Sequence, residues 1–118
     1  MRRIAIYLLL LPLLGVGCGT KSPPAPTAES STIEYRDGVF SPREVKIGVG
    51  GTVIFKNVGT TPVWPASDAH PTHLRCPGFD ALRSLNTGEI YSFTFIKAET
   101  CPFHNHLSAT ETGTIVVK

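Results

Sequence analysis

The sequence has little charge, no basic cluster after its first residues, and no convincing amphipathic helical repeat. Charged residues make up 17% of the 118 residues, and the formal net charge is only +2. This excludes the basic surface that nucleic-acid binding requires, so we expect no nucleic-acid partner. The chain also lacks a Ser/His/Asp order, a phosphate-cradling glycine loop and a carboxylate pair, which excludes the common hydrolytic sites. An internal repeat is absent as well.

The first apolar run is too short to span a membrane comfortably and follows a basic start, Arg2 and Arg3. Small residues then lead into Cys18. This order is typical of a secretory signal, predicted here over residues 1–17. A cysteine directly after small residues resembles a bacterial lipobox, although Gly15 stands where leucine is usual. The resemblance implies a lipid on Cys18 and a location in the bacterial cell envelope, facing the periplasm or the exterior.

Residues 18–31 combine this cysteine with a segment rich in Pro, Ser and Ala. Such a composition cannot bury a core and is typical of an extended tether. The folded domain is therefore predicted over residues 32–118. The membrane would be reached through the lipid anchor only.

Short alternating or β-branched segments with Gly, Pro and Asn between them dominate the domain. They predict seven strands, at residues 33–36, 39–42, 44–47, 52–56, 89–96, 100–106 and 113–117, with an extended piece at 62–65. In the 89–96 strand, the aromatic set is expected to face the core. Residues 66–88 are interpreted as a long functional loop with a helical turn near 80–84. The fold class is all-β, a Greek-key antiparallel β-sandwich.

All four histidines fall in two short clusters, His70 with His73 and His104 with His106. Imidazole is the commonest side-chain ligand for borderline metals, so the two clusters together could supply a whole coordination sphere. The competing interpretation is four loop histidines without a shared task. Because no histidine lies elsewhere, we favour a metal site.

With Cys18 lipidated, Cys76 and Cys101 remain as a pair, which in an exported domain predicts a disulfide. The alternative is a thiolate ligand, since Cys101 and His104 have a Cys-x-x-His spacing. In an extended segment, however, Cys101 points to the face opposite His104 and His106. The bridge is therefore favoured over Cys ligation.

Several strand motifs resemble those of bacterial cupredoxin-like domains. They are YRDGVFSP at 35–42, GTVIF at 51–55, GEIYSFTF at 88–95, HNH at 104–106 and GTIVV at 113–117. The resemblance covers nearly the whole domain. It implies a Greek-key sandwich with a copper site at one end, between the loop after the central strand and the final hairpin. Both histidine clusters fall in these two places.

The chain departs from the blue-copper pattern, which uses two His, one Cys thiolate and usually a weak axial Met. The only methionine is Met1. Val63 stands near the usual first His, Asn105 near the usual Cys, and Glu111 roughly at the axial position. Without these ligands the metal would be held by imidazoles.

The predicted ligands are His70, His73, His104 and His106. Asp68 and Glu111 are candidates for weak ligands or for residues that lie behind the ligands. Neutral imidazoles suit Cu(II) in a tetragonal geometry and Zn(II) in a tetrahedral one. The resemblance favours copper. Trp64 is interpreted as a core or loop-packing aromatic, and Asp80 as a turn former.

The leading hypothesis is an exported copper-binding protein with a His-rich, type-2-like site, for copper handling or electron transfer. It would work with a redox or copper-trafficking protein partner, and we expect a binding protein rather than an enzyme. Three alternatives remain open: a blue-copper-type electron carrier using Cys101 and His104, an enzyme with a mononuclear His site, and a metal-free β-sandwich interaction module.

Overall fold

The computed structural model of the protein describes residues 12, 15–24 and 29–118. Most of the predicted signal and residues 25–28 of the predicted tether lie outside the described residues. Residues 15–24 form neither helix nor strand, and Cys18 is exposed. Among the described residues, no helix is long and apolar enough to cross a membrane.

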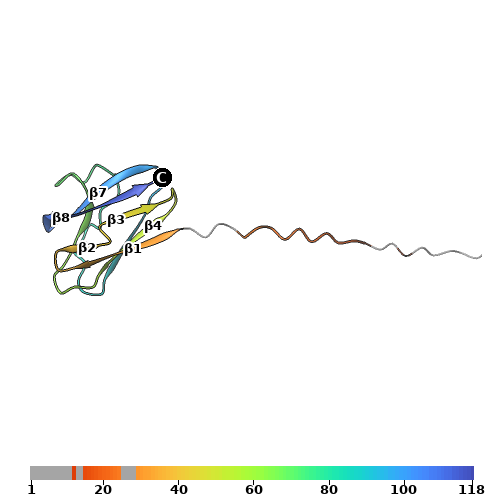
Figure 1. Cartoon of the computed structure of the whole chain (residues 1–118), viewed down its shortest axis with the longest axis horizontal. Coiled ribbons are helices and arrows are strands. Elements are labelled where there is room, and N and C mark those ends of the chain that lie inside the picture. Colours follow the sequence, from red (N-terminus) through yellow and green to blue (C-terminus); the bar gives the residue numbers. More distant parts are fainter. Residues whose placement is uncertain (1–11, 13–14, 25–28) are drawn as a thin grey trace, which may run out of the picture.

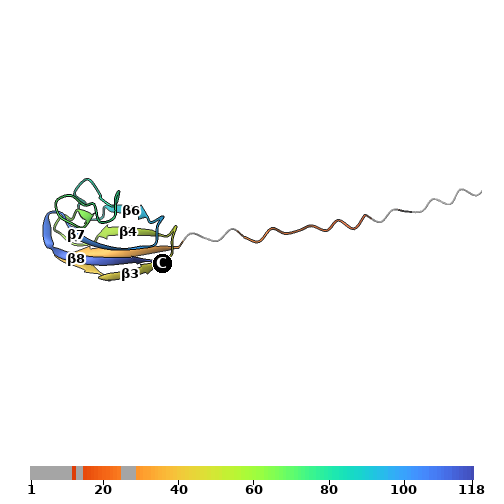
Figure 2. The same cartoon turned by 90° about the horizontal axis from the view of Figure 1, so that it is seen from above.

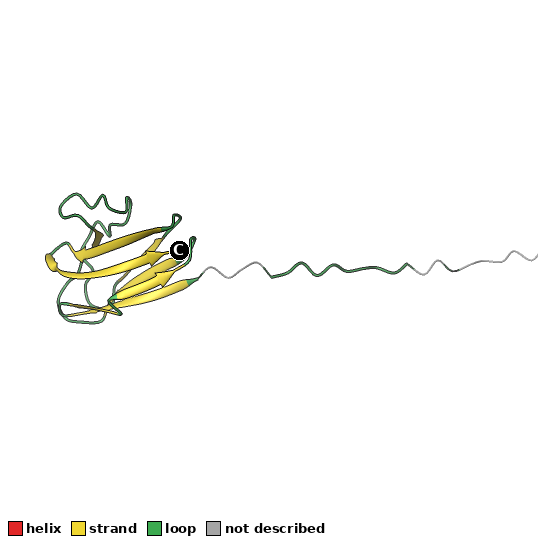
Figure 3. Cartoon of the chain, turned by 45° about the horizontal axis from the view of Figure 1, so that its top comes forward, coloured by secondary structure: helices red, strands yellow, loops and turns green. Residues whose placement is uncertain are grey.

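Eight strands build the domain, which contains no helix in the described part of the chain (Figure 3). One sheet has the order β2 (Val39–Ser41), β1 (Ser30–Arg36), β4 (Thr52–Asn57) and β6 (Ile90–Thr94). The other has the order β3 (Glu44–Ile47), β8 (Ser108–Val117), β7 (Glu99–Asn105) and β5 (Pro65–Ser67). Figure 1 labels most of these strands, and Figure 2 shows β4 and β6 on one side of the sandwich with β3, β7 and β8 on the other.

The all-β sandwich agrees with the prediction, but the two sheets are mixed rather than wholly antiparallel. Strands β1 and β4 pair in parallel, and so do β3 and β8. The remaining strand pairs are antiparallel. Alternation of side chains has the same period in both kinds of sheet, so it does not reveal strand direction. Strand β1 also begins at Ser30, two residues before the predicted start of the domain.

An aromatic core joins the two sheets. In β4 the alternating residues Val53 and Phe55 are buried. In β6 the aromatic residues turn inward as predicted, while Ile90 on the other face is exposed. Phe79 is fully buried and stacks at 5.5 Å between ring centroids on Phe55. The core is thus closed by a residue of the long segment between β4 and β6, which ties that segment to the sandwich.

The segment between β4 and β6 gathers at the end of the sandwich away from the C-terminus, where it is drawn in green (Figure 1). The helical turn predicted near residues 80–84 is absent. Instead, Leu85 forms a bridge with Val63, and Asp80 forms one with Ala66. Across the segment, the amides of Ala81 and Leu85 donate to the carbonyls of Pro65 and Val63 in place of helical bonds.

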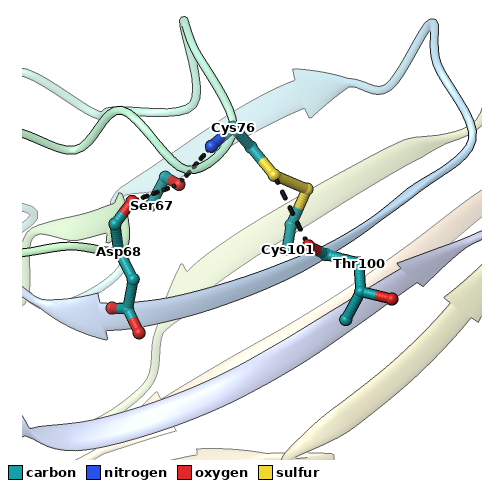
Figure 4. Close-up of a disulfide and its surroundings, with 5 residues drawn as sticks. All are labelled: Ser67, Asp68, Cys76, Thr100 and Cys101. Atoms are coloured by element: carbon teal, nitrogen blue, oxygen red, sulfur yellow. Dashed lines mark hydrogen bonds between the residues drawn. A yellow bond between two sulfur atoms is a disulfide. The ribbon is translucent and has the colours of Figure 1, made fainter.

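Cys76 and Cys101 form the predicted disulfide (Figure 4). Both residues are buried. The Cys76 amide donates a hydrogen bond to Ser67 Oγ at 2.7 Å, and the Ser67 hydroxyl donates to the Asp68 carbonyl at 3.0 Å. The bridge therefore fixes the loop that follows β5 against strand β7.

Candidate metal centre

The first histidine cluster lies in a tight turn that follows β5. The Asp68 amide donates to the Pro102 carbonyl at 3.0 Å, which holds the start of the turn on β7. The His73 amide donates to the Ala69 carbonyl at 2.7 Å, and the Arg75 amide donates to the Asp68 carbonyl at 2.6 Å. These bonds fold the chain back on itself, so that the turn lies over the end of β7.

The second cluster lies where β7 passes into β8. A register shift between His104 and Asn105 ends the regular pairing of these strands. His106 follows in the turn, and its amide donates to the Trp64 carbonyl at 2.7 Å. His104 pairs with Ala66 of β5. The end of β7 and the turn after it thus deliver two imidazoles to the place where the turn after β5 delivers the other two.

All four histidines converge on one point. Each offers a ring nitrogen, and these four atoms lie within 4.8 Å of one another. His70 Nδ1 lies 3.2 Å from His104 Nε2, and His106 Nδ1 lies 3.0 Å from His73 Nε2. Two histidine clusters that are more than thirty residues apart in the sequence therefore form a single site.

Carboxylates hold the two most buried imidazoles from behind. Asp68 Oδ1 lies 2.6 Å from His104 Nδ1, and Asp80 Oδ2 lies 2.7 Å from His73 Nδ1. A carboxylate accepts the proton of Nδ1, which selects one tautomer and leaves the lone pair on Nε2. In both rings, Nε2 is the atom that faces the other histidines. The carboxylates thus orient two donors toward the centre of the cluster.

Asp80 was interpreted from the sequence as a turn former, and its contact with His73 was missed. It has both roles, because the Leu82 amide donates to Oδ1 at 2.8 Å. The Trp64 indole also donates to Oδ1, at 2.6 Å. Burial pushes the pKa of the Asp80 carboxyl up, but the indole, the Leu82 amide and an imidazole donate hydrogen bonds that bring the pKa below its ordinary value. The only sequence signal for the contact between Asp80 and His73 was the presence of an acidic residue in the same loop as the histidine.

Trp64 packs on the site as a loop residue rather than as part of the core. Its ring lies 4.5 Å from the ring of His106, at an interplanar angle of 44°. Burial lowers the pKa of His106, and the neighbouring His73 and His70 lower it further, against the attraction of Asp80. A lowered pKa keeps the imidazole neutral, which is the form that binds metals.

Glu111 lies outside the four-histidine group. Its Oε2 accepts hydrogen bonds from the Tyr35 hydroxyl at 2.9 Å and from Asn105 Nδ2 at 2.8 Å. Asn105 Oδ1 in turn accepts from the amides of Trp64 and Leu107. Glu111 therefore reaches the site through Asn105, the buried residue between the two histidines of the second cluster.

Sulfur ligands are absent from the described site. The disulfide occupies the sulfur atoms of both Cys76 and Cys101, so a thiolate site on Cys101 with His104 is wrong. The second group of potential ligands in the described chain, these two cysteines with Glu99, loses its thiolates for the same reason.

The donor set fits a metal ion held by four imidazoles. With metal–nitrogen bonds of about 2.0 Å, neighbouring nitrogen atoms are about 2.8 Å apart in a tetragonal site and about 3.3 Å apart in a tetrahedral one. The two observed nitrogen–nitrogen distances, 3.0 and 3.2 Å, lie between these values. Small movements of the rings would bring all four atoms into a coordination sphere.

No protein-family model matches the chain, and no curated protein is similar enough to count as a relative. Solved structures do match. A novel purple cupredoxin from Nitrosopumilus maritimus superposes with a TM-score of 0.65 at 20% identity, over 75% of this chain and 99% of that one. The fold is cupredoxin-like. A mutant of amicyanin in its reduced state gives a TM-score of 0.63 at 24% identity, over 80% of this chain and 85% of that one.

A larger protein contains the same cupredoxin-like fold. The Cu-containing nitrite reductase from Thermus scotoductus SA-01 matches with a TM-score of 0.64 at 22% identity, over 80% of this chain but only 23% of that one. These likenesses establish the fold predicted from the strand motifs. The four-histidine cluster is a feature of this chain's own residues.

Proposed function

We propose that this protein binds Cu(II) through His70, His73, His104 and His106 and serves in copper handling. The convergence of four ring nitrogens within 4.8 Å carries the proposal. Two of the rings are buried and already oriented by carboxylates, so little reorganisation is needed for binding. The copper proteins among the structural neighbours support the choice of metal.

The charges around the cluster favour a divalent ion. Asp68 and Asp80 each contact an imidazole, and their two negative charges balance those of Cu(II) or Zn(II). A monovalent ion would leave one negative charge uncompensated in a partly buried site, which is costly. Between the two divalent ions, a nitrogen site binds Cu(II) more tightly than Zn(II).

The same features favour holding copper over carrying electrons. A fast electron carrier must stabilise both oxidation states, and blue-copper sites use a Cys thiolate for this purpose. Here the donors are imidazoles alone, with charges that match the oxidised ion. We therefore favour storage or transfer of Cu(II), with a copper-trafficking protein as the partner.

The proposal includes a location in the bacterial cell envelope. The leader sequence and Cys18 support export and lipidation, and the disulfide suits an oxidising compartment. A Cys18→Ser variant should then leave the membrane fraction and fail to incorporate a labelled fatty acid. Incorporation equal to that of the unmodified chain would overturn the anchor.

Spectroscopy of the purified protein tests the site. One equivalent of Cu(II) should be retained, with weak visible absorption and nitrogen hyperfine structure in the electron paramagnetic resonance spectrum. His104→Ala should lose this signal, while Thr72→Ala, in the same loop as His70, should keep it. An intense visible charge-transfer band would indicate a thiolate instead. Copper retention unchanged by His104→Ala would refute the proposed ligand set.

A further inference from the structure

Three of the four histidines are fixed by groups behind or beside them. His104 is 1% exposed and His73 is 8% exposed, and each has its Nδ1 on a carboxylate. His106 is only partly exposed, lies under the Trp64 ring, and has its amide bonded to the Trp64 carbonyl. Displacing any of these rings would break a buried or partly buried contact.

His70 lacks such support. It is exposed, and so are its neighbours Ala69, Pro71 and Thr72. Its Nδ1 faces His104 Nε2, at the centre of the cluster. Within residues 29–118, no hydrogen bond holds its Nε2 or its backbone amide. In the metal-loaded protein, where the ion would bind His104 Nε2, the ring can therefore swing out into water without leaving that buried nitrogen unpaired.

From this asymmetry, and resting on the proposed function, we infer that His70 is an exchangeable ligand. The coordination position it fills is the one through which a donor from outside the chain reaches the metal. With His70 turned away, three anchored imidazoles and one open position remain, and that open position is the feature that lets a metal site take an external ligand.

The charge balance specifies the class of the incoming donor. Asp68 and Asp80 already match the charge of a divalent ion. An anion at the open position would add an unbalanced negative charge beside these carboxylates, whereas a neutral nitrogen donor would not. A neutral nitrogen donor therefore suits the open position, and the commonest such donor to a metal in proteins is imidazole. In transfer of the ion to or from a partner, it would be the side chain of a partner's histidine.

Chemical rescue of the copper-loaded protein tests this inference. His70→Ala should fold normally and bind Cu(II) with an altered resonance spectrum. Added free imidazole should return that spectrum toward the unmodified one in a saturable manner, whereas azide should do so poorly. His104→Ala, which is expected to lose the Cu(II) signal, should not regain it when imidazole is added, because the place of its missing ring is buried. An absent response in His70→Ala, an equal response in His104→Ala, or a preference for azide would overturn the inference.

A readout without metal complements the rescue. Mild carbethoxylation of the metal-free protein, followed by peptide mass spectrometry, should modify His70 at least tenfold faster than His104. Equal rates would contradict the difference in anchoring. Failure of the unmodified protein to retain Cu(II) would refute the proposed function itself. Retention by the unmodified protein without rescue of His70→Ala would refute only the exchange.

Discussion

The disulfide is expected to supply a large part of the stability of this small domain. It joins residues separated by 25 positions. In the chain-entropy treatment, a closed loop of that length destabilises the unfolded state by about 3.5 kcal/mol at 25 °C. For a domain of this size, such a loss lowers Tm by roughly 15–25 °C. We therefore expect reduction to shift the thermal transition by an amount of this order.

The measurement is thermal unfolding of the oxidised protein, the reduced protein and the Cys76→Ala/Cys101→Ala double variant. Alanine is preferred to serine because both sites are buried and a hydroxyl would lack a partner. The reduced protein keeps both sulfur atoms, so its difference from the double variant isolates the packing contribution. An unchanged midpoint after reduction would refute the loop-closure reasoning.

The metal site should survive loss of the bridge in the folded protein. Its loop is also held by the amide of Asp68 on Pro102 and by the amide of residue 76 on Ser67. At 25 °C, where the double variant is still folded, Cu(II) affinity should fall by less than about tenfold, or 1.4 kcal/mol. A larger loss would mean that the bridge, rather than these hydrogen bonds, positions the histidines.

Three further predictions concern the site and the core. Asp68→Asn should weaken Cu(II) binding by about 10–100-fold in a chelator competition, because it replaces the charged acceptor that orients a ligand with a weaker neutral one, while the exposed Glu44→Gln should leave the affinity unchanged. Phe79→Ala should cost about 3–5 kcal/mol of unfolding free energy, against about 0.5 kcal/mol or less for the exposed Leu82→Ala. The metal-free protein should lose stability as pH falls below about 6.5, because His106 has a lowered pKa and the unfolded chain binds the proton more readily. Thermal melts of the unmodified protein and of His106→Asn check the last of these. The Tm of the variant should depend less on pH in that range, and an equal dependence of Tm on pH in the two proteins would contradict the prediction.

Local pattern was enough to predict most strands and the disulfide. Val53 and Phe55 alternate with less buried residues along β4, and the aromatic residues of β6 follow the same rule. The pairing of Cys76 with Cys101 followed from the number of cysteines and from the predicted export. These features depend on side-chain period and on residue type, which a sequence displays directly.

The same patterns did not reveal contacts between segments that are distant in the sequence. The parallel pairing of β1 with β4 was missed because the alternation of buried and exposed side chains is the same in parallel and antiparallel strands. The predicted helical turn near 80–84 gave way to bridges with residues 63 and 66. The contact between Asp80 and His73 was missed for a related reason: a turn-forming aspartate looks the same whether or not its free oxygen meets a histidine.

Residue order alone predicts four imidazoles in two clusters, in the loop and hairpin regions of a β-rich domain. The three-dimensional fold is needed to know that these clusters share one centre, which rings are buried, and which ring is exposed. Residue type and spacing fix what donors a segment offers, whereas burial and carboxylate contacts arise from segments that are distant in the chain and meet only in the folded state.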